Sequence, residues 1–129
     1  MNRTICVLAL LGVGLLPACG DDDPAADVDL PPAAVEGREV VRNKGCAACH
    51  GANGGGGVGP SFVGLYGSEV PLQDHDPVIA DREYIVESIV DPGAKLVQGY
   101  NLPMPSTELS DAEIDAVVAY IEALAEVSA

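Results

Sequence analysis

Two cysteines and a histidine stand together in the segment Cys46-Ala47-Ala48-Cys49-His50. Thiols at this spacing can add across the two vinyl groups of a haem, and the adjacent imidazole is then held where it can bind the iron. The motif therefore predicts one covalently bound haem c, with Cys46 and Cys49 as attachment points and His50 as an axial ligand. A haem held in this way moves single electrons.

Two other kinds of site also use a Cys-x-x-Cys pair. A thioredoxin-like redox motif needs a strand before it, and no strong strand pattern precedes Cys46. A zinc site needs further ligands at metal spacing. The remaining cysteines, Cys6 and Cys19, lie in a segment that looks like an export signal, and the only other histidine is His75. Haem attachment accounts for the motif better than either alternative.

The iron of such a haem has a sixth position, for which Met104 is the candidate ligand. It is the only methionine besides Met1, and it lies between Pro103 and Pro105, which limit the backbone freedom of the loop. A thioether ligand favours reduced iron and raises the potential. A methionine can also fill a gap in a core, but one between two prolines suits that role poorly. His75, in a polar loop, is the competing ligand and would give a site of lower potential.

Pro60 is a candidate second-shell residue. A ligating imidazole normally donates its other N–H to a carbonyl or carboxylate, which fixes the orientation of the ring. The pair Gly59-Pro60 follows the haem motif closely enough for the Pro60 carbonyl to accept from His50.

Helical patterns flank the motif on both sides. Residues 35–43 carry an apolar stripe that includes Gly37, and a glycine inside a helix indicates the close approach of another element. Residues 81–90 form a second helical pattern, which Asp81 can cap.

Residues 110–125 show the clearest helical pattern. Ser110 and Glu113 fit a capping box, and one apolar stripe runs along the segment. The run Gly54 to Gly57 predicts a flexible loop rather than a phosphate cradle, since no strand precedes it and no P-loop lysine follows. Little alternation supports a sheet, so the domain is predicted to be mainly α-helical with long loops.

The first residues read as a targeting segment. Arg3 precedes an uncharged apolar stretch, residues 5–16, that is too short to span a bilayer comfortably. The sequence then reads Leu16-Pro17-Ala18-Cys19, which resembles the lipobox of bacterial lipoproteins, where the cysteine becomes the lipidated N-terminus. The alternatives are an ordinary secretory signal cut near Ala18 and an uncleaved anchor.

Three regions are therefore expected along the chain. Residues 1–18 form a lipoprotein signal peptide, residues 19–34 an acidic, proline-rich tether, and residues 35–127 the haem domain. Two acyl chains on Cys19 would suffice for stable anchoring. The protein is accordingly expected to be exported and lipid-anchored to a bacterial membrane, facing the periplasm or the outer side of the cytoplasmic membrane.

The chain is strongly acidic, with a formal charge of −14, which becomes −15 if the signal leaves with Arg3. Nucleic acid is an improbable partner at this charge, because binding it depends on lysine and arginine. A basic docking face on a redox partner fits better, although acidity also serves solubility. The sequence has no tryptophan and a single phenylalanine, Phe62, so a haem would supply apolar body to a small core.

Taken together, these features resemble class I c-type cytochromes. The segments that carry the resemblance are Cys46 to His50, Gly59-Pro60, the Met104 loop and the terminal amphipathic helix, in the usual order. Gly37 and Tyr120 look like the family's helix-crossing pair, whereas Val41 stands where an aromatic residue is common. The resemblance implies the small all-α class I cytochrome c fold, with its helices packed around one haem.

A closer resemblance is to the cytochrome c domain fused to subunit II of some haem-copper oxidases. It covers residues 37–124 and is carried by Gly59-Pro60-Ser61-Phe62, Gly64-Leu65-Tyr66-Gly67, Asp91-Pro92-Gly93-Ala94-Lys95, Gly99-Tyr100 and Met104-Pro105-Ser106. The chain resembles that module standing alone on a lipid tether. The resemblance implies a carrier that accepts an electron and passes it to a terminal oxidase.

We therefore expect a monohaem electron carrier, not an enzyme, with no small-molecule substrate. Its partners would be respiratory redox proteins such as a terminal oxidase or a quinol-oxidising complex. One alternative is a haem protein with an open or displaceable sixth site, which would reduce peroxide or bind a gas. The other is a non-redox accessory subunit of an oxidase.

Overall fold

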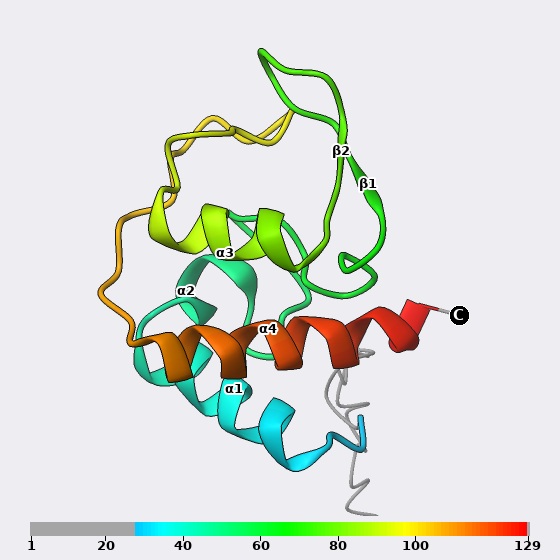
Figure 1. Ribbon diagram of the computed structural model, residues 1–129, viewed down its shortest axis with the longest axis vertical. Coiled ribbons are helices and arrows are strands. Elements are labelled where there is room, and N and C mark those ends of the chain that lie inside the picture. Colours follow the sequence, from blue (N-terminus) through cyan, green and yellow to red (C-terminus); the bar gives the residue numbers. More distant parts are fainter. Residues whose placement is uncertain (1–27, 129) are drawn as a thin grey trace, which may run out of the picture.

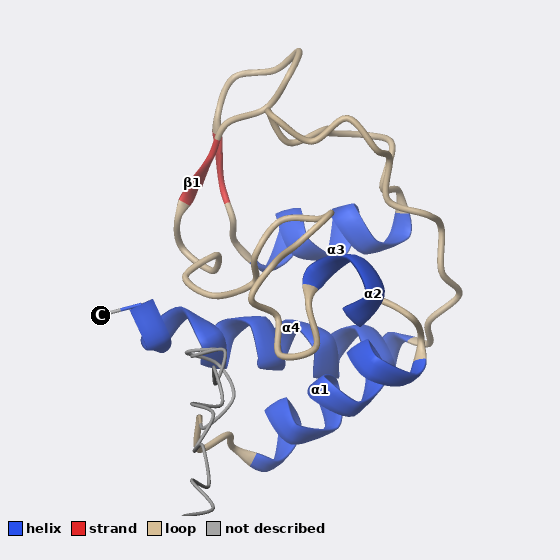
Figure 2. Cartoon of the chain, turned by 180° about the vertical axis from the view of Figure 1, so that it is seen from behind, coloured by secondary structure: helices blue, strands red, loops and turns tan. Residues whose placement is uncertain are grey.

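The computed structural model describes residues 28–128 (Figure 1). The predicted signal peptide, the predicted lipidation site Cys19 and most of the predicted tether lie outside the described residues. The described elements are α1 (Pro32–Asn43), α2 (Ala47–His50), β1 (Glu69–Val70), β2 (Val78–Ile79), α3 (Arg82–Val90), α4 (Asp111–Ala125) and the 3₁₀ turn η1 (Glu126–Ser128). The domain is mainly helical, as predicted, and long loops join its helices (Figure 2).

The first and last helices, α1 and α4, cross in close contact at one side of the molecule (Figure 1). A Cβ atom added to Gly37 would lie 1.9 Å from the carbonyl oxygen of Ala116 and 2.8 Å from the Cβ of Tyr120. Only glycine allows the two backbones to approach this closely. The Gly37–Tyr120 crossing pair expected from the resemblance is therefore present, and Val41 is fully buried beside it.

Helix α1 begins at Pro32, three residues before the start expected at residue 35. A proline suits the first turn of a helix, because its missing N–H would have no partner there and its φ angle is already helical. Ala34 is fully buried, and Val28 and Leu30 pack against the core. Residues 32–34, which composition placed in the tether, thus belong to the first helix.

The other two long helices begin at the residues that the sequence indicated. The side chain of Asp81 accepts a hydrogen bond from the backbone N–H of Tyr84 at 2.9 Å, which caps α3. Ser110 accepts from the backbone N–H of Glu113, while its own N–H donates to the Glu113 carboxylate at 2.8 Å. Both predicted caps are confirmed, and they fix where α3 and α4 enter the core.

A small antiparallel sheet was not predicted. Strands β1 and β2 pair Glu69 with Ile79 and Val70 with Val78, and a further bridge joins Leu72 to Val97. Strands of two residues are too short to show alternation in the sequence. Their role is to hold the chain on either side of the loop that reaches farthest from α4 (Figure 1). Within residues 28–128, no helix has the length and apolar character needed to cross a membrane.

Candidate cofactor site

The short helix α2 presents the cysteine–histidine motif. It lies between Gly45 and Gly51, whose φ angles of 85° and 87° let the chain turn sharply at each end. Cys46 precedes the helix, Cys49 and His50 close it, and all three side chains are half-buried. Both cysteines are free thiols. They are therefore available for bonds to an added group.

One ring nitrogen of His50 is already hydrogen-bonded to the backbone. Its Nδ1 lies 2.8 Å from the carbonyl oxygen of Pro60, the partner that the sequence analysis assigned to it. A carbonyl can only accept, so Nδ1 carries the proton and Nε2 keeps its lone pair. Burial lowers the pKa of this imidazole, and the bond to Pro60 opposes that shift only in part. The ring is held in the neutral tautomer that can ligate a metal.

Two further residues contact the His50 ring and hold it in place. Neither contact was predicted from the sequence. The ring of Phe62 stacks on the imidazole, with centroids 4.5 Å apart and planes 21° from parallel. A Cβ atom on Gly59 would lie 3.0 Å from Cε1 of His50, so the small residue there gives the ring its room. The segment Gly59-Pro60-Ser61-Phe62 carried the resemblance, but only the structure shows what it contacts.

The glycine-rich loop, residues 51–59, is hydrogen-bonded to the carbonyl groups of α2. The N–H of Gly56 donates to the carbonyl of His50 at 2.7 Å, and the N–H of Gly59 donates to that of Cys49 at 2.9 Å. Gly54 is buried, with a φ angle of 79° and no room for a Cβ atom beside Leu124. The expected flexible loop is thus fixed by backbone hydrogen bonds and close packing.

A cavity of about 320 Å³ opens in front of His50, and a second hollow of about 390 Å³ adjoins it. The two share several lining residues, among them His50, Pro60, Tyr100 and Met104. The lining of the first cavity is mostly apolar, with aliphatic side chains from α1, α3 and α4. Volumes of this order are typical of cofactor sites. An apolar cavity with two thiols, an imidazole and a thioether on its walls fits a haem.

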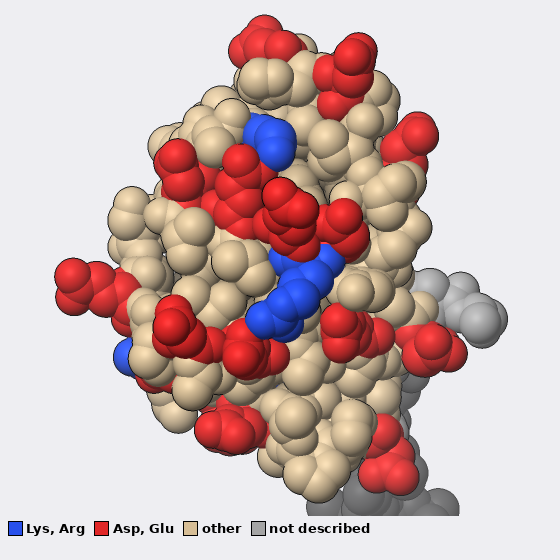
Figure 3. Space-filling model, in the orientation of Figure 1, with Lys and Arg blue, Asp and Glu red and all other residues tan. Residues whose placement is uncertain are grey.

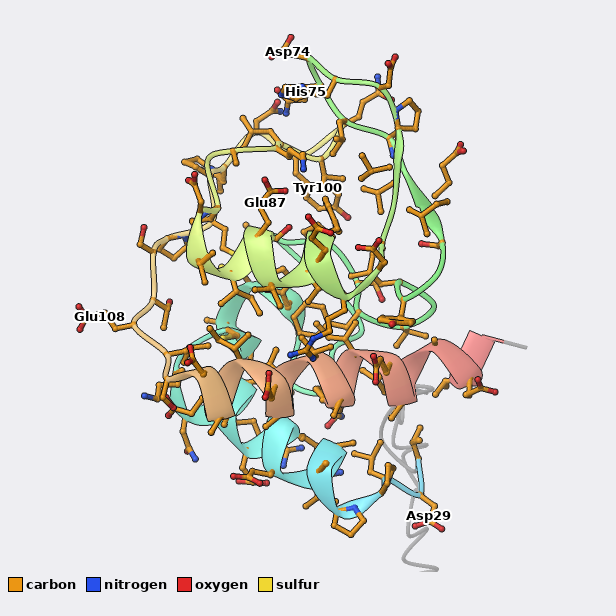
Figure 4. The ribbon with its side chains drawn as sticks, viewed as in Figure 1. Asp29, Asp74, His75, Glu87, Tyr100 and Glu108 are labelled. Atoms are coloured by element: carbon orange, nitrogen blue, oxygen red, sulfur yellow. The ribbon has the colours of Figure 1, made fainter. Side chains whose placement is uncertain are left out.

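Met104 lies in the same hollows as His50, whereas His75 does not. Residues 101–110 contain no helix or strand, and they bring the half-buried Met104 side chain to both hollows. His75 is exposed, next to Asp74 at the end of the loop between β1 and β2 (Figure 4). It lines neither hollow. Within residues 28–128, no three histidine, cysteine or acidic side chains gather to hold a metal ion, so zinc gains no support.

Acidic side chains spread over the face formed by α3 and α4, with few basic ones among them (Figure 3). Most cations of the described residues are paired with acidic side chains: Arg42 with Glu39 on α1, Lys44 with Glu113, Arg82 with Asp115, and Lys95 with Glu87. The chain therefore presents a negative field to approaching molecules.

Comparison with known families places the site in context. The family model for cytochrome c matches residues 34–125 of the chain. No significant match to a curated protein was found. The matched range begins inside α1 and ends at the last residue of α4, so it includes every element that lines the cavity.

Proposed function

The chain belongs to the cytochrome c family, and on that premise we propose that it is a monohaem electron carrier with His50 and Met104 as axial ligands. It binds haem c covalently through Cys46 and Cys49, and it exchanges electrons with redox protein partners. When bound, the haem supplies a one-electron couple at its iron. The carrier role includes no transformation of a substrate.

The observation that carries this proposal is the shared cavity of His50 and Met104. The bond between Nδ1 of His50 and the Pro60 carbonyl directs the other ring nitrogen away from the backbone. Met104 reaches the same hollows from a different segment. The two side chains thus supply one nitrogen and one sulfur ligand, a pair that suits a high-potential carrier.

The second hollow also gives a place for electron exchange. It is lined by Cys49 together with Val58 and Leu102, which are 57% and 70% exposed. We propose that a redox partner docks over these apolar side chains, because they line the same hollow as Cys49, through which the edge of the haem would be bonded. The acidic surface would steer a partner with a basic face. The resemblance to the oxidase-fused domain supports a terminal oxidase as the acceptor.

The ligand assignment is tested by optical spectra and redox titration of the purified holoprotein. We expect the weak long-wavelength band of thioether-bound ferric iron in the unaltered protein. Met104→Ala should abolish that band, lower the reduction potential and let carbon monoxide bind the reduced iron. His75→Ala is the matched control and should change none of the three.

Other results would favour the alternative functions. Carbon monoxide binding by the unaltered protein would indicate an open or displaceable sixth site and a catalytic or gas-binding role. Unaltered oxidase turnover with Met104→Ala, in a protein that co-purifies with the oxidase, would indicate an accessory subunit.

We further propose that the protein is exported and anchored through lipid on Cys19. The support is the sequence Leu16-Pro17-Ala18-Cys19 after an uncharged apolar stretch. Cys19→Ala should move the protein from the membrane fraction to the soluble fraction of a cell lysate, with its haem intact. Retention of the variant in the membrane fraction would contradict the lipoprotein assignment.

A further inference from the structure

The cavity has two chemically different ends. Cys49, Val58 and Lys44 line only the second hollow. Ser68, Glu69 and Lys95 line only the first cavity. Cys46, His50 and Met104 line both, so the space runs from a thiol end, where Cys49 lies, to an end that carries Ser68, Glu69 and Lys95.

The chemistry of haem indicates which edge of the cofactor would lie at each end. The two vinyl groups lie on neighbouring pyrroles, and the two propionates lie on the remaining pyrroles, across the ring. Thioether bonds to Cys46 and Cys49 fix the vinyl edge at the thiol end, which directs the propionate edge to the other end. A carboxylate brought into a mostly apolar cavity needs a cation or hydrogen-bond donors, since its desolvation is otherwise too costly.

Among the residues that line the first cavity, Lys95 is the only lysine or arginine. Its ammonium group is paired with Glu87 of α3, and the two side chains are 33% and 37% exposed. A pair this exposed is weak, and an ammonium group has three N–H donors, so Glu87 does not exhaust them. Lys44, in contrast, lies at the thiol end and is paired with Glu113.

The surroundings of Lys95 suit a second carboxylate. Tyr84 and Ser88 of α3 line the same cavity, as does Tyr100 of the following loop. Figure 4 shows Glu87 and Tyr100 in the space between α3 and the loop that follows it. The Ser88 hydroxyl already donates to the carbonyl oxygen of Tyr84 at 2.8 Å, so the phenol groups of Tyr84 and Tyr100 are the candidate donors to a carboxylate that Lys95 neutralises.

We propose that Lys95 binds a haem propionate and so fixes the end of the haem opposite the thioether bonds. This inference rests on the proposed carrier function, because it needs haem in the cavity. Glu87 then shares the ammonium group with the propionate. Lys95 is a positioning residue, and its charge also favours the ionised propionate.

The test is the pH dependence of the reduction potential, measured on the holoprotein from about pH 4 to pH 9. An ionised propionate favours ferric iron, so the potential falls as pH rises through the pKa of the propionate. Removing a nearby cation raises that pKa, by about 1 unit for a partly exposed contact. Lys95→Gln should therefore move the fall in potential to a pH about 1 unit higher, and Lys95→Arg should restore it.

Two further variants separate this effect from general charge effects. Lys44→Gln removes the same charge at the thiol end and should leave the pH of the fall unchanged. The acids that act on Lys95 are Glu87 and Glu83 of α3, while Glu69 of β1 lines the same cavity, and Glu87 is freed when Lys95 is lost. The shift must therefore persist in the double variant Lys95→Gln/Glu87→Gln.

An unchanged pH profile in Lys95→Gln, or an equal shift in Lys44→Gln, would overturn the proposal. Loss of the shift in the double variant would assign the effect to Glu87 and overturn it as well. A holoprotein without a reversible one-electron couple would instead contradict the carrier function, so the two failures are distinguishable.

Discussion

Two regions that border the same site are packed very differently. One is the crossing of α1 and α4, and the other is the segment 101–110. At the crossing, helix packs on helix, and Val41, Val118 and Leu124 are at most 1% exposed. The segment 101–110 has no helix or strand, and its Leu102 is 70% exposed. Yet this segment carries Met104, the proposed sixth ligand.

The difference shows how the domain divides its tasks. The helix crossing is held by contacts between protein atoms, which exist whatever occupies the cavity. Most residues of the segment 101–110 are exposed, so its position would depend more on the proposed bond between Met104 and the iron and on the surface of a bound haem. Substitutions at the crossing should therefore change the stability of folding, whereas substitutions at Met104 should change the redox properties.

The largest effect is expected from adding a single methyl group at the crossing. In Gly37→Ala the new Cβ atom would lie 1.9 Å from a backbone oxygen of Ala116, so the helices must move apart. We expect the free energy of unfolding to fall by about 3 kcal/mol, at the upper end of overpacking effects. Denaturant unfolding of the holoprotein measures this change.

Gly93→Ala is the matched control in a loop outside the helix crossing. Gly93 lies in the loop after α3, and the nearest atom to an added Cβ atom there is 3.9 Å away. The same methyl group should leave the free energy of unfolding within about 0.5 kcal/mol of its original value. Equal losses in the two variants would refute the division between a packed crossing and a loosely packed loop.

The sequence predicted the packed part well, because its signals are local and periodic. The capping box of Ser110 and Glu113 and the cap at Asp81 marked where two helices begin, and both are present. The apolar stripe of residues 110–125 indicated the face of α4 that the structure buries. Gly37 inside a helix indicated a close crossing, and the resemblance named Tyr120 as its partner.

The contacts within the site were harder to predict, because loops bring them together. No periodic pattern indicates that Phe62 stacks on His50, or that Gly59 leaves room for the ring. The hydrogen bond from His50 to Pro60 was predicted from the general needs of a ligating imidazole rather than from spacing alone. The start of α1 was placed too late, because two prolines in an acidic segment were interpreted as linker.

A smaller effect is expected at Glu113, where the segment 101–110 joins the helix crossing. The Glu113 carboxylate lies 2.9 Å from Nζ of Lys44, just after α1, and it also accepts hydrogen bonds from Ser110. The nearby Lys44 ammonium group and the Ser110 bonds lower the pKa of Glu113 from 4.5 to about 2. The folded protein thus favours the ionised form, which stabilises it above about pH 4.5.

That stabilisation should be lost progressively as the pH falls from 4.5 through about 2, because the carboxylate becomes protonated over this range. Glu113→Gln should lower the denaturant midpoint much more at pH 6 than at pH 2, and 1 M salt should reduce the effect at pH 6 by screening. Glu108→Gln, an exposed carboxylate in the segment 101–110 (Figure 4), is the control and should change neither midpoint. A pH-independent loss in Glu113→Gln would show that helix capping alone, without the link to Lys44, joins this segment to the crossing.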